Sequence, residues 1–431
     1  MRSSVFRHRL LLLAVAVLVA VPALSALGAA SLPGDNRRLS GTAAVGDENF
    51  PAIAYNSAAE EYLVVWEDDR MAAARGSDIY GRRLDRIGRP LGEDFRICGP
   101  SAWADDKDPS VAYNSTANEY LVVWSDRRSY STRGFDIYAR RVSAAGVPLG
   151  DADFRVVSDQ AAADDLSPDV AFNSKANRYL VVWQDFRYAG TSGWTIFGRL
   201  VKPAGTPVGG DRNISGAGPY GSEWAPAVAY DSSADQYLVV WHDMRNYYTR
   251  GADIYGRRLD GQARNLAGFR ISGAGGFVDQ KWPDVTYNRT SQQFLVVWED
   301  GRRDDTRGVD IWGRFVASSG GPAGKDFRVS DNPATGDERY PALAWDSLAD
   351  RYLVAWQGDR LGGWQVFARR VAAAGAPSGQ ALRISEPPAA VASYPAVGYG
   401  AGAGEFLVVW QDQRDLASVG TDIYGQRVTG G

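Results

Sequence analysis

One pentapeptide recurs along the chain at a nearly constant interval. Tyr-Leu-Val-Val-Trp at 62–66 returns six times, with Phe replacing Tyr or Ala replacing Val in three of the copies. The copies end at Trp66, Trp124, Trp183, Trp241, Trp298, Trp356 and Trp410, which lie 54 to 59 residues apart. Repeats of this length that fill a chain without linkers pack against one another and form one continuous core.

Each repeat reads as four short strands. The first opens at a proline, as at 51–55, and alternates small residues with aliphatic or aromatic ones. The pentapeptide is the second, and its unbroken apolar run predicts burial on both faces. Asp-Ile-Tyr-Gly-Arg-Arg-Leu at 78–84 is the third, and 95–97 the fourth, after a Gly/Pro turn. No helical periodicity appears after the leader, so the fold class is all-β.

Seven units of four antiparallel strands predict a seven-bladed β-propeller. The ends of the chain complement each other. The seventh unit stops after its third strand at 422–428, whereas Arg-Arg-Leu-Ser-Gly at 37–41 resembles the fourth strand Phe-Arg-Ile-Ser-Gly at 269–273. We expect the N-terminal strand to pair with the last blade and close the ring, which leaves no open sheet edge.

The N-terminal segment has the layout of a secretory signal. Residues 1–9 carry three arginines, 10–21 are apolar, and Gly28 and Ala30 suit a cleavage site. We expect 1–30 to be a signal peptide and 31–431 a single propeller domain, monomeric and secreted or extracytoplasmic, in the periplasm or at the cell surface. An uncleaved anchor is the alternative. No later segment is long and apolar enough to span a membrane.

Charge and composition exclude several classes of function. The formal net charge is −4 and no long basic run is present, which argues against binding nucleic acid. One Cys and two His, of which His8 lies in the leader, argue against disulfide frameworks, zinc sites and Ser-His-Asp catalysis. We therefore predict no cofactor, no metal site and no catalytic triad.

The repeated strings Trp-x-Asp-x-Arg and Asp-Ile-Tyr-Gly-Arg resemble those of bacterial secreted β-propeller proteins, both Trp-Asp repeats and periplasmic propellers with Asp-Ile-Tyr strands. The resemblance covers about 400 residues and implies the fold alone. The Gly-His pair of Trp-Asp repeats is missing, so their partners are not implied. Propellers serve as binding modules, scaffolds, hydrolases and lyases.

Repetition also separates structural residues from functional ones. We expect the Arg of Trp-x-Asp-x-Arg to bridge the second strand to the Asp that opens the third, such as Asp78. Cys98 occupies a position held by Ser in other units and is interpreted as a substituted strand residue rather than a nucleophile. His242 fills the variable position of Trp-x-Asp, which we expect to face solvent.

The loops that precede the first strands carry aromatic residues in five units that are adjacent once the ring closes. They are accompanied by carboxylates, including Asp279 and Asp337. Such a surface suits stacking on sugar rings and hydrogen bonding to hydroxyls. The alternative is that each aromatic plugs a blade end. The aromatics are Phe50, Trp224, Trp282, Tyr340 and Tyr394.

Two units depart from the repeat at the Asp that opens the third strand, where they carry Thr195 and Gln365. We expect Arg187 and Arg360 in these units to be available to an anionic ligand. Departures from a repeated rule are places where function is expected.

These observations favour a secreted binding or scaffold module for an extracellular glycan or protein. The alternative is a glycan-active hydrolase or lyase that uses carboxylates on the loop face. No single carboxylate pair stands out in the sequence.

Overall fold

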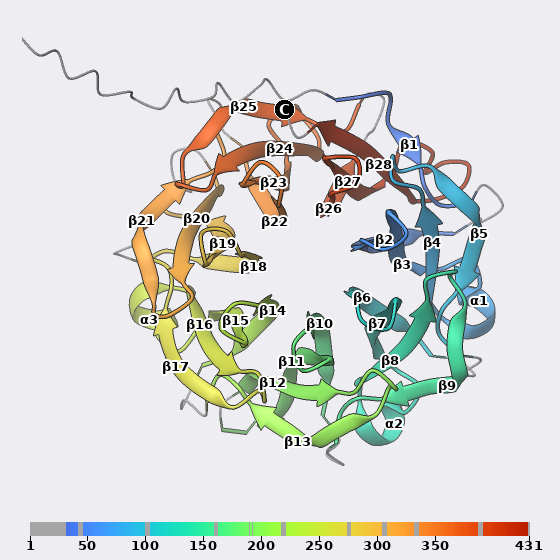
Figure 1. Ribbon diagram of the computed structural model, residues 1–431, viewed down its shortest axis with the longest axis horizontal. Coiled ribbons are helices and arrows are strands. Elements are labelled where there is room, and N and C mark those ends of the chain that lie inside the picture. The colour runs from blue at the N-terminus through green and yellow to red at the C-terminus, as the bar shows by residue number, and fades with distance from the viewer. Residues whose placement is uncertain are drawn as a thin grey trace, which may run out of the picture.

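The computed structural model describes residues 32–41, 46–99, 104–158, 163–188, 190–191, 193–216, 221–273, 277–303, 308–331, 336–386 and 391–429. Their strands form seven four-stranded antiparallel sheets, the blades, arranged in a ring (Figure 1). The predicted seven-bladed propeller is therefore confirmed. The expected signal peptide lies outside the described residues, and within them no helix is long and apolar enough to cross a membrane.

The first two strands of each blade form its inner half. The innermost strands surround the axis of the ring (Figure 1), and small residues alternate in them with larger ones, as at 52–55. They are β2 (Glu48–Asn56), β6 (Asp106–Asn114), β10 (Asp165–Asn173), β14 (Glu223–Asp231), β18 (Gln280–Asn288), β22 (Glu338–Asp346) and β26 (Ala392–Gly400). The second strands are β3 (Glu61–Asp68), β7 (Glu119–Asp126), β11 (Arg178–Tyr188), β15 (Gln236–Asp243), β19 (Gln293–Asp300), β23 (Arg351–Gly358) and β27 (Glu405–Asp412).

The outer half of each blade holds its third and fourth strands. The third strands are β4 (Asp78–Leu84), β8 (Asp136–Ser143), β12 (Gly193–Val201), β16 (Asp253–Asp260), β20 (Asp310–Ala317), β24 (Gln365–Ala372) and β28 (Asp422–Thr429). The fourth are β5 (Pro90–Arg96), β9 (Pro148–Arg155), β13 (Pro207–Asn213), β17 (Asn265–Arg270), β21 (Pro322–Arg328), β25 (Pro377–Arg383) and, in blade 7, β1 (Arg37–Arg38).

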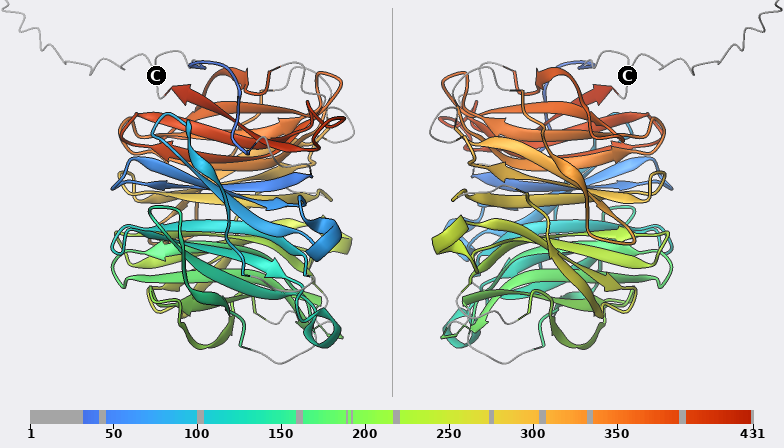
Figure 2. Two further views of the ribbon diagram at one scale, coloured as in Figure 1. Left: turned by 90° about the vertical axis from the view of Figure 1, so that its right-hand side faces the viewer. Right: turned by 90° about the vertical axis from the view of Figure 1, so that its left-hand side faces the viewer.

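Within the described residues, three of the loops between second and third strands contain a single helical turn, which the sequence did not reveal. Four residues are too few to show a helical period. The turns lie on the same face of the disc, as the blue and yellow-green helices show in the two side views (Figure 2). They are α1 (Ala72–Arg75), α2 (Tyr130–Arg133) and α3 (Tyr247–Arg250).

The N-terminal strand closes the ring as predicted. Arg38 pairs with Tyr424 of β28 in antiparallel register and forms an ion pair with Asp422. The backbone N–H of Leu39 donates to the carbonyl of Ile423 at 2.7 Å, and the Leu39 side chain is buried between the last blade and the first. The first described segment of the chain therefore completes blade 7.

The second strands form the core of the blades, and the Tyr-Leu-Val-Val-Trp residues are buried throughout. The Trp-x-Asp motif owes its repetition to a local bond. The indole N–H of Trp66 donates to Asp68 Oδ2 at 2.9 Å, and all blades except blade 6 repeat this bond. In blade 6 Gly358 replaces the Asp, and the buried Trp356 indole N–H has no partner.

The arginine of the motif pairs differently from the prediction. Arg70 donates to both oxygens of Asp68 at 2.7 and 2.6 Å and to Asp94 of the fourth strand at 2.9 Å. The predicted partner, Asp78, instead accepts from Arg96 at 2.5 Å. The prediction was wrong because the fourth strand, which it left out, supplies both an acid and a base to this network.

Candidate functional site

The residue before the proline of each innermost strand leaves the regular strand geometry. In all seven blades it has a positive φ of 50 to 53° and lies at a shift of strand register. Such a bulge re-aims a side chain, and its cost for a non-glycine residue is borne by the surrounding fold. These seven residues line a cavity of about 670 Å³ at the axis of the ring: Phe50, Asp108, Ser167, Ala225, Trp282, Tyr340 and Tyr394.

The variable position of Trp-x-Asp supports this bulge from the preceding blade. Glu299 Oε1 accepts the backbone N–H of Tyr340 at 2.8 Å, and Gln357 Oε1 accepts that of Tyr394 at 3.0 Å. The expectation that this position faces solvent was wrong. His242 is 5% exposed, and burial lowers its pKa to about 3, so the ring is neutral. Glu, Gln and Ser at this position all accept the N–H, whereas the His242 ring packs against Trp224 and Trp282 and its Nδ1 has no hydrogen-bond partner.

One wall of the cavity is aromatic. Phe50 and Tyr394 have ring centroids 4.6 Å apart, Tyr394 and Tyr340 4.6 Å, and Tyr340 and Trp282 5.2 Å. Four predicted site residues thus form a continuous arc across blades 5, 6, 7 and 1. Because the positions are equivalent in all blades and only these four carry aromatics, the arc is not a requirement of the fold.

The fifth predicted aromatic, Trp224, lies one residue earlier in its strand, and Ala225 takes its place at the cavity. The Trp224 ring is parallel to that of His242 within 5° and lies 5.3 Å from Trp194, measured between centroids. His242 in turn lies 5.7 Å from Trp282. The structure therefore connects Trp224 to the arc through His242, outside the residues that line the cavity.

The same cavity holds two carboxylates that the sequence analysis missed, Asp169 in blade 3 and Asp284 in blade 5. Asp169 and Asp284 directly follow the proline, where the other blades carry Ala or Ser. Asp169 accepts from Ser110 Oγ at 2.8 Å and from the Val228 N–H at 2.7 Å. Burial, and secondarily the charge of Asp169, raise the pKa of Asp284 to about 7. This break in the Ala/Ser pattern was the available signal.

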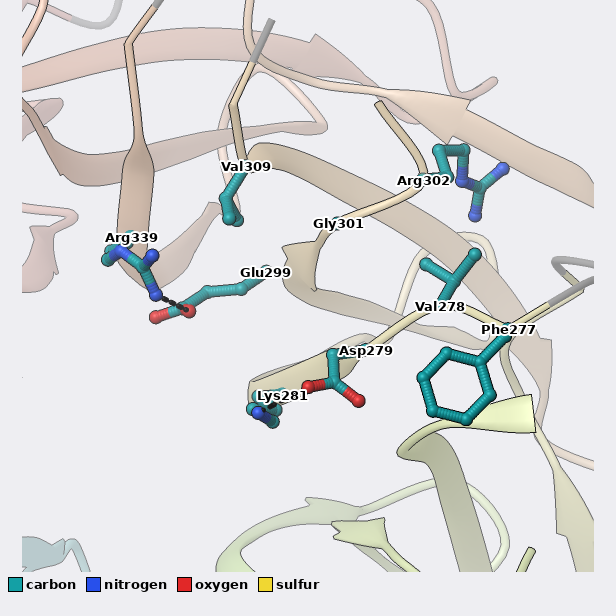
Figure 3. A pocket seen from close by; sticks show the side chains of 9 residues that line it. All are labelled: Phe277, Val278, Asp279, Lys281, Glu299, Gly301, Arg302, Val309 and Arg339. Carbon is teal, nitrogen blue, oxygen red and sulfur yellow. Dashed lines mark hydrogen bonds and ion pairs between the residues drawn. The ribbon is translucent and has the colours of Figure 1, made fainter. Parts of the chain in front are cut away.

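A second pocket of about 740 Å³ lies beside the aromatic wall, between blades 5 and 6 (Figure 3). Side chains of both signs of charge line this pocket. Lys281 pairs with Asp279 at 2.7 Å, and Arg339 approaches Glu299 at 3.5 Å. Burial raises the pKa of Glu299 to about 7. Burial acts the same way on Asp279, but hydrogen bonds from Lys281 and a backbone N–H outweigh it and leave its pKa below the ordinary value.

The two carboxylates predicted as site residues have a structural task as well. Asp279 Oδ1 accepts the Ala252 N–H at 3.1 Å, and Asp337 Oδ1 accepts the Val309 N–H at 3.0 Å. Both bonds join the start of one blade to the third strand of the blade before it. Asp279 lines the second pocket, whereas Asp337 holds Arg339 at its edge.

The two arginines predicted to be available are both engaged. Arg187 is bound to Asp185 and donates to Asp211 at 3.0 Å, while Arg360 donates to Asp331 at 3.3 Å and lies over the Phe367 ring. The expectation assumed that this arginine pairs with the acid that opens the third strand. In the blades that have such an acid, the arginine pairs with other acids, so the loss of that acid does not free the arginine. Neither residue lines the two pockets.

No protein-family model matches the chain, and no curated protein matches it in sequence. Solved structures resemble it in fold. An α-L-arabinanase from Penicillium chrysogenum, complexed with arabinobiose, has 12% identity and a TM-score of 0.52 over 93% of this chain and 98% of its own. The polysaccharide lyase Uly1 has 10% identity and a TM-score of 0.52 over 90% and 91%.

A puromycin hydrolase mutant has 11% identity and a TM-score of 0.56 over 88% of this chain and 54% of its own. At these identities the likeness shows the propeller fold alone.

Proposed function

We propose that this protein is a glycan-active propeller that binds a carbohydrate chain in the axial cavity and cleaves it there. One observation carries the proposal: an aromatic arc and two buried carboxylates, Asp169 and Asp284, line the same cavity. Of the two functions expected from the sequence, this is the one given as the alternative.

The aromatic arc suits the apolar faces of sugar rings. Trp282 is 37% exposed and Tyr340 and Tyr394 are half-buried, so each offers a face while its other side packs on a neighbour. A large apolar face with a polar tip is the combination that recognition sites use. A concave cavity of about 670 Å³ fits a few sugar units.

The carboxylates suit the cleavage of a glycosidic bond. Glycosidases use one carboxylic acid that protonates the leaving oxygen and one carboxylate that acts as base or nucleophile. Burial raises the pKa of both carboxylates here, that of Asp284 to about 7. With a pKa of about 7, Asp284 holds a proton over much of the neutral range, and we assign it the acid role. Asp169 is the second carboxylate.

The known folds add support. An arabinanase and a polysaccharide lyase are among the proteins with this architecture, and both are glycan-active by name. Secretion, which stays a prediction from the N-terminal segment, would place the cavity among extracellular polysaccharides.

A binding module without catalysis is the second candidate, favoured by one observation. Both oxygens of Asp169 and both of Asp284 accept hydrogen bonds, the latter from the Val285 and Leu343 N–H groups at 2.7 and 3.0 Å. In this role the carboxylates would tie neighbouring blades together and hydrogen-bond sugar hydroxyls.

The test is a panel of plant, algal and microbial polysaccharides, with new reducing or unsaturated ends measured for the mature protein and for Asp284→Asn. The variant should lose roughly 10²- to 10⁴-fold in rate, the usual contribution of a general acid or base, and keep its affinity. Ser110→Ala, which removes one hydrogen bond to Asp169, is the matched control and should lose far less. If the wild type binds a polysaccharide but does not cleave it, the protein is a binding module rather than an enzyme. If Asp284→Asn cleaves at the rate of the wild type, Asp284 is not the general acid.

A further inference from the structure

A cluster of three buried side chains that line neither pocket joins blade 1 to blade 2. Asp78 opens β4, Cys98 follows β5 and Asp106 opens β6, and they are 2%, 4% and 1% exposed. One oxygen of each carboxylate and the Cys98 sulfur all lie within 4.8 Å of one another. Two blades therefore bring two oxygen ligands and one sulfur ligand to one point.

The hydrogen bonds around this point leave one side chain without donors. Asp78 Oδ1 accepts from Arg96 at 2.5 Å and from the Cys98 thiol at 3.4 Å, and the Ile79 N–H donates to the sulfur at 3.3 Å. Neither oxygen of Asp106 accepts a hydrogen bond, nor does Asp78 Oδ2, which Arg75 approaches at 3.5 Å. Buried carboxylate oxygens without a donor are costly, and a cation is one group that satisfies them.

The other blade junctions show what the position of Cys98 requires for folding. The equivalent residue is Ser in five junctions and Val157 in one. Ser215 and Ser272 accept the backbone N–H of the third strand at 3.0 Å, as the Cys98 sulfur does. A hydroxyl thus meets the structural need. Among the seven junctions, whose equivalent residues the structure all describes, only this one places a thiol between two carboxylates.

The charged neighbours of the cluster lie mainly on the side of Asp78. Arg96 pairs with Asp78 Oδ1 at 2.5 Å and Arg75 approaches Asp78 Oδ2 at 3.5 Å. Asp106 instead faces a further carboxylate, Asp126, across its strand pair. Buried carboxylates beside one another are unfavourable, and a cation next to Asp106 would relieve this repulsion.

We propose that Asp78, Cys98 and Asp106 form a structural site for a divalent metal ion of the zinc class. A thiolate with two carboxylates selects a borderline-soft ion over magnesium or calcium, which take oxygen ligands. Binding displaces the protons of the thiol and of Asp106, so up to two protons leave as one divalent ion enters. The ion would join the outer strands of blade 1 to the innermost strand of blade 2. The sequence analysis missed this site because its ligands, 20 and 8 residues apart, lie in or beside different strands of two blades.

The test uses the mature full-length protein, freed of metal with a chelator and titrated with Zn²⁺, and with Co²⁺ as a spectroscopic probe. We expect one ion per chain, proton release, and a sulfur-to-cobalt charge-transfer absorption in the near ultraviolet. Cys98→Ser, which restores the residue of five other blades and should therefore fold, must lose that absorption and at least tenfold in Zn²⁺ affinity. Asp106→Asn should weaken binding similarly.

Asp165→Asn, at the position of Asp106 in the next blade, is the control and should bind as the wild type does. The proposal is overturned if the wild type binds no ion, if its cobalt complex lacks the sulfur absorption, or if Cys98→Ser binds Zn²⁺ with unchanged affinity. None of these results depends on glycan cleavage, so the two proposals stand or fall separately.

Discussion

Deleting residues 35–41 should open the ring between blades 7 and 1 and lower the apparent melting temperature by roughly 5 °C or more. The segment supplies the fourth strand of blade 7 and the buried Leu39 side chain. It also supplies the Arg38–Asp422 ion pair and a hydrogen bond from Asn36 Nδ2 to Ile384 O at 2.9 Å in blade 6. Truncation of a buried Leu alone costs about 2–5 kcal/mol, and the deletion also exposes a sheet edge.

Two substitutions isolate the cause. Leu39→Ala should reproduce a large part of the loss, whereas Arg37→Ala, at an exposed position of the same strand, should change the melting temperature little. Thermal melts followed by circular dichroism give all three values. A deletion variant that melts within about a degree of the wild type would show that the ring does not depend on this strand.

Stability should fall as the pH rises from about 4.5 to about 8. Burial raises the pKa of Glu48, Glu223 and Glu338 from 4.5 to about 8 each. Between those values the folded protein binds more protons than the unfolded chain, so the free energy of unfolding decreases with rising pH. The contribution is complete below the unfolded pKa of 4.5 and is lost as the pH passes the folded pKa. Three such groups imply a change of several kcal/mol.

Blade 5 carries a neutral glutamine at the position of these buried glutamates, and this glutamine shows which bond a protonated glutamate can make. The residue, Gln280, donates from Nε2 to Asp300 Oδ2 at 2.8 Å across the strand pair. Glu223 faces Asp243 in the same register and accepts from Ser215, with Arg245 at 3.5 Å. Glu223→Gln should therefore unfold at higher denaturant concentration than the wild type at pH 8, with a smaller difference at pH 5. Parallel profiles for the two proteins would contradict the assignment.

The sequence predicted the fold because each strand type repeats seven times with its own pattern. The pentapeptide indicated the buried second strand, and the resemblance of 37–41 to 269–273 indicated how the ring closes; both were confirmed. The partner of Arg70 was wrong because a local pattern cannot say which of several nearby acids a flexible side chain meets. Asp94 reaches it from another strand, 24 residues further along.

The candidate site was only partly predictable. Adjacency of Trp282, Tyr340, Tyr394 and Phe50 followed from counting around a closed ring, but whether they line a cavity depends on the bulge before each proline. That bulge has no signature in residue type, since Asp, Ser and Ala adopt it as well. The burial of His242 was missed for a related reason, because variation between repeats was taken as a sign of exposure. The Glu, Gln and Ser residues at this position share a hydrogen bond to backbone, and His242 is buried against Trp224 and Trp282 instead.

The most direct test of the central claim is calorimetric titration of the mature protein and of a Trp282→Ala, Tyr340→Ala double variant with oligosaccharides of the polysaccharide that it binds best. Each side chain presents a face to the cavity and neither belongs to the buried Trp set of the second strands. We predict that binding is lost in the double variant while its melting temperature stays within a few degrees of that of the wild type. Unchanged affinity together with a large loss of stability would show that the aromatic arc only packs the blade ends, and would contradict the account.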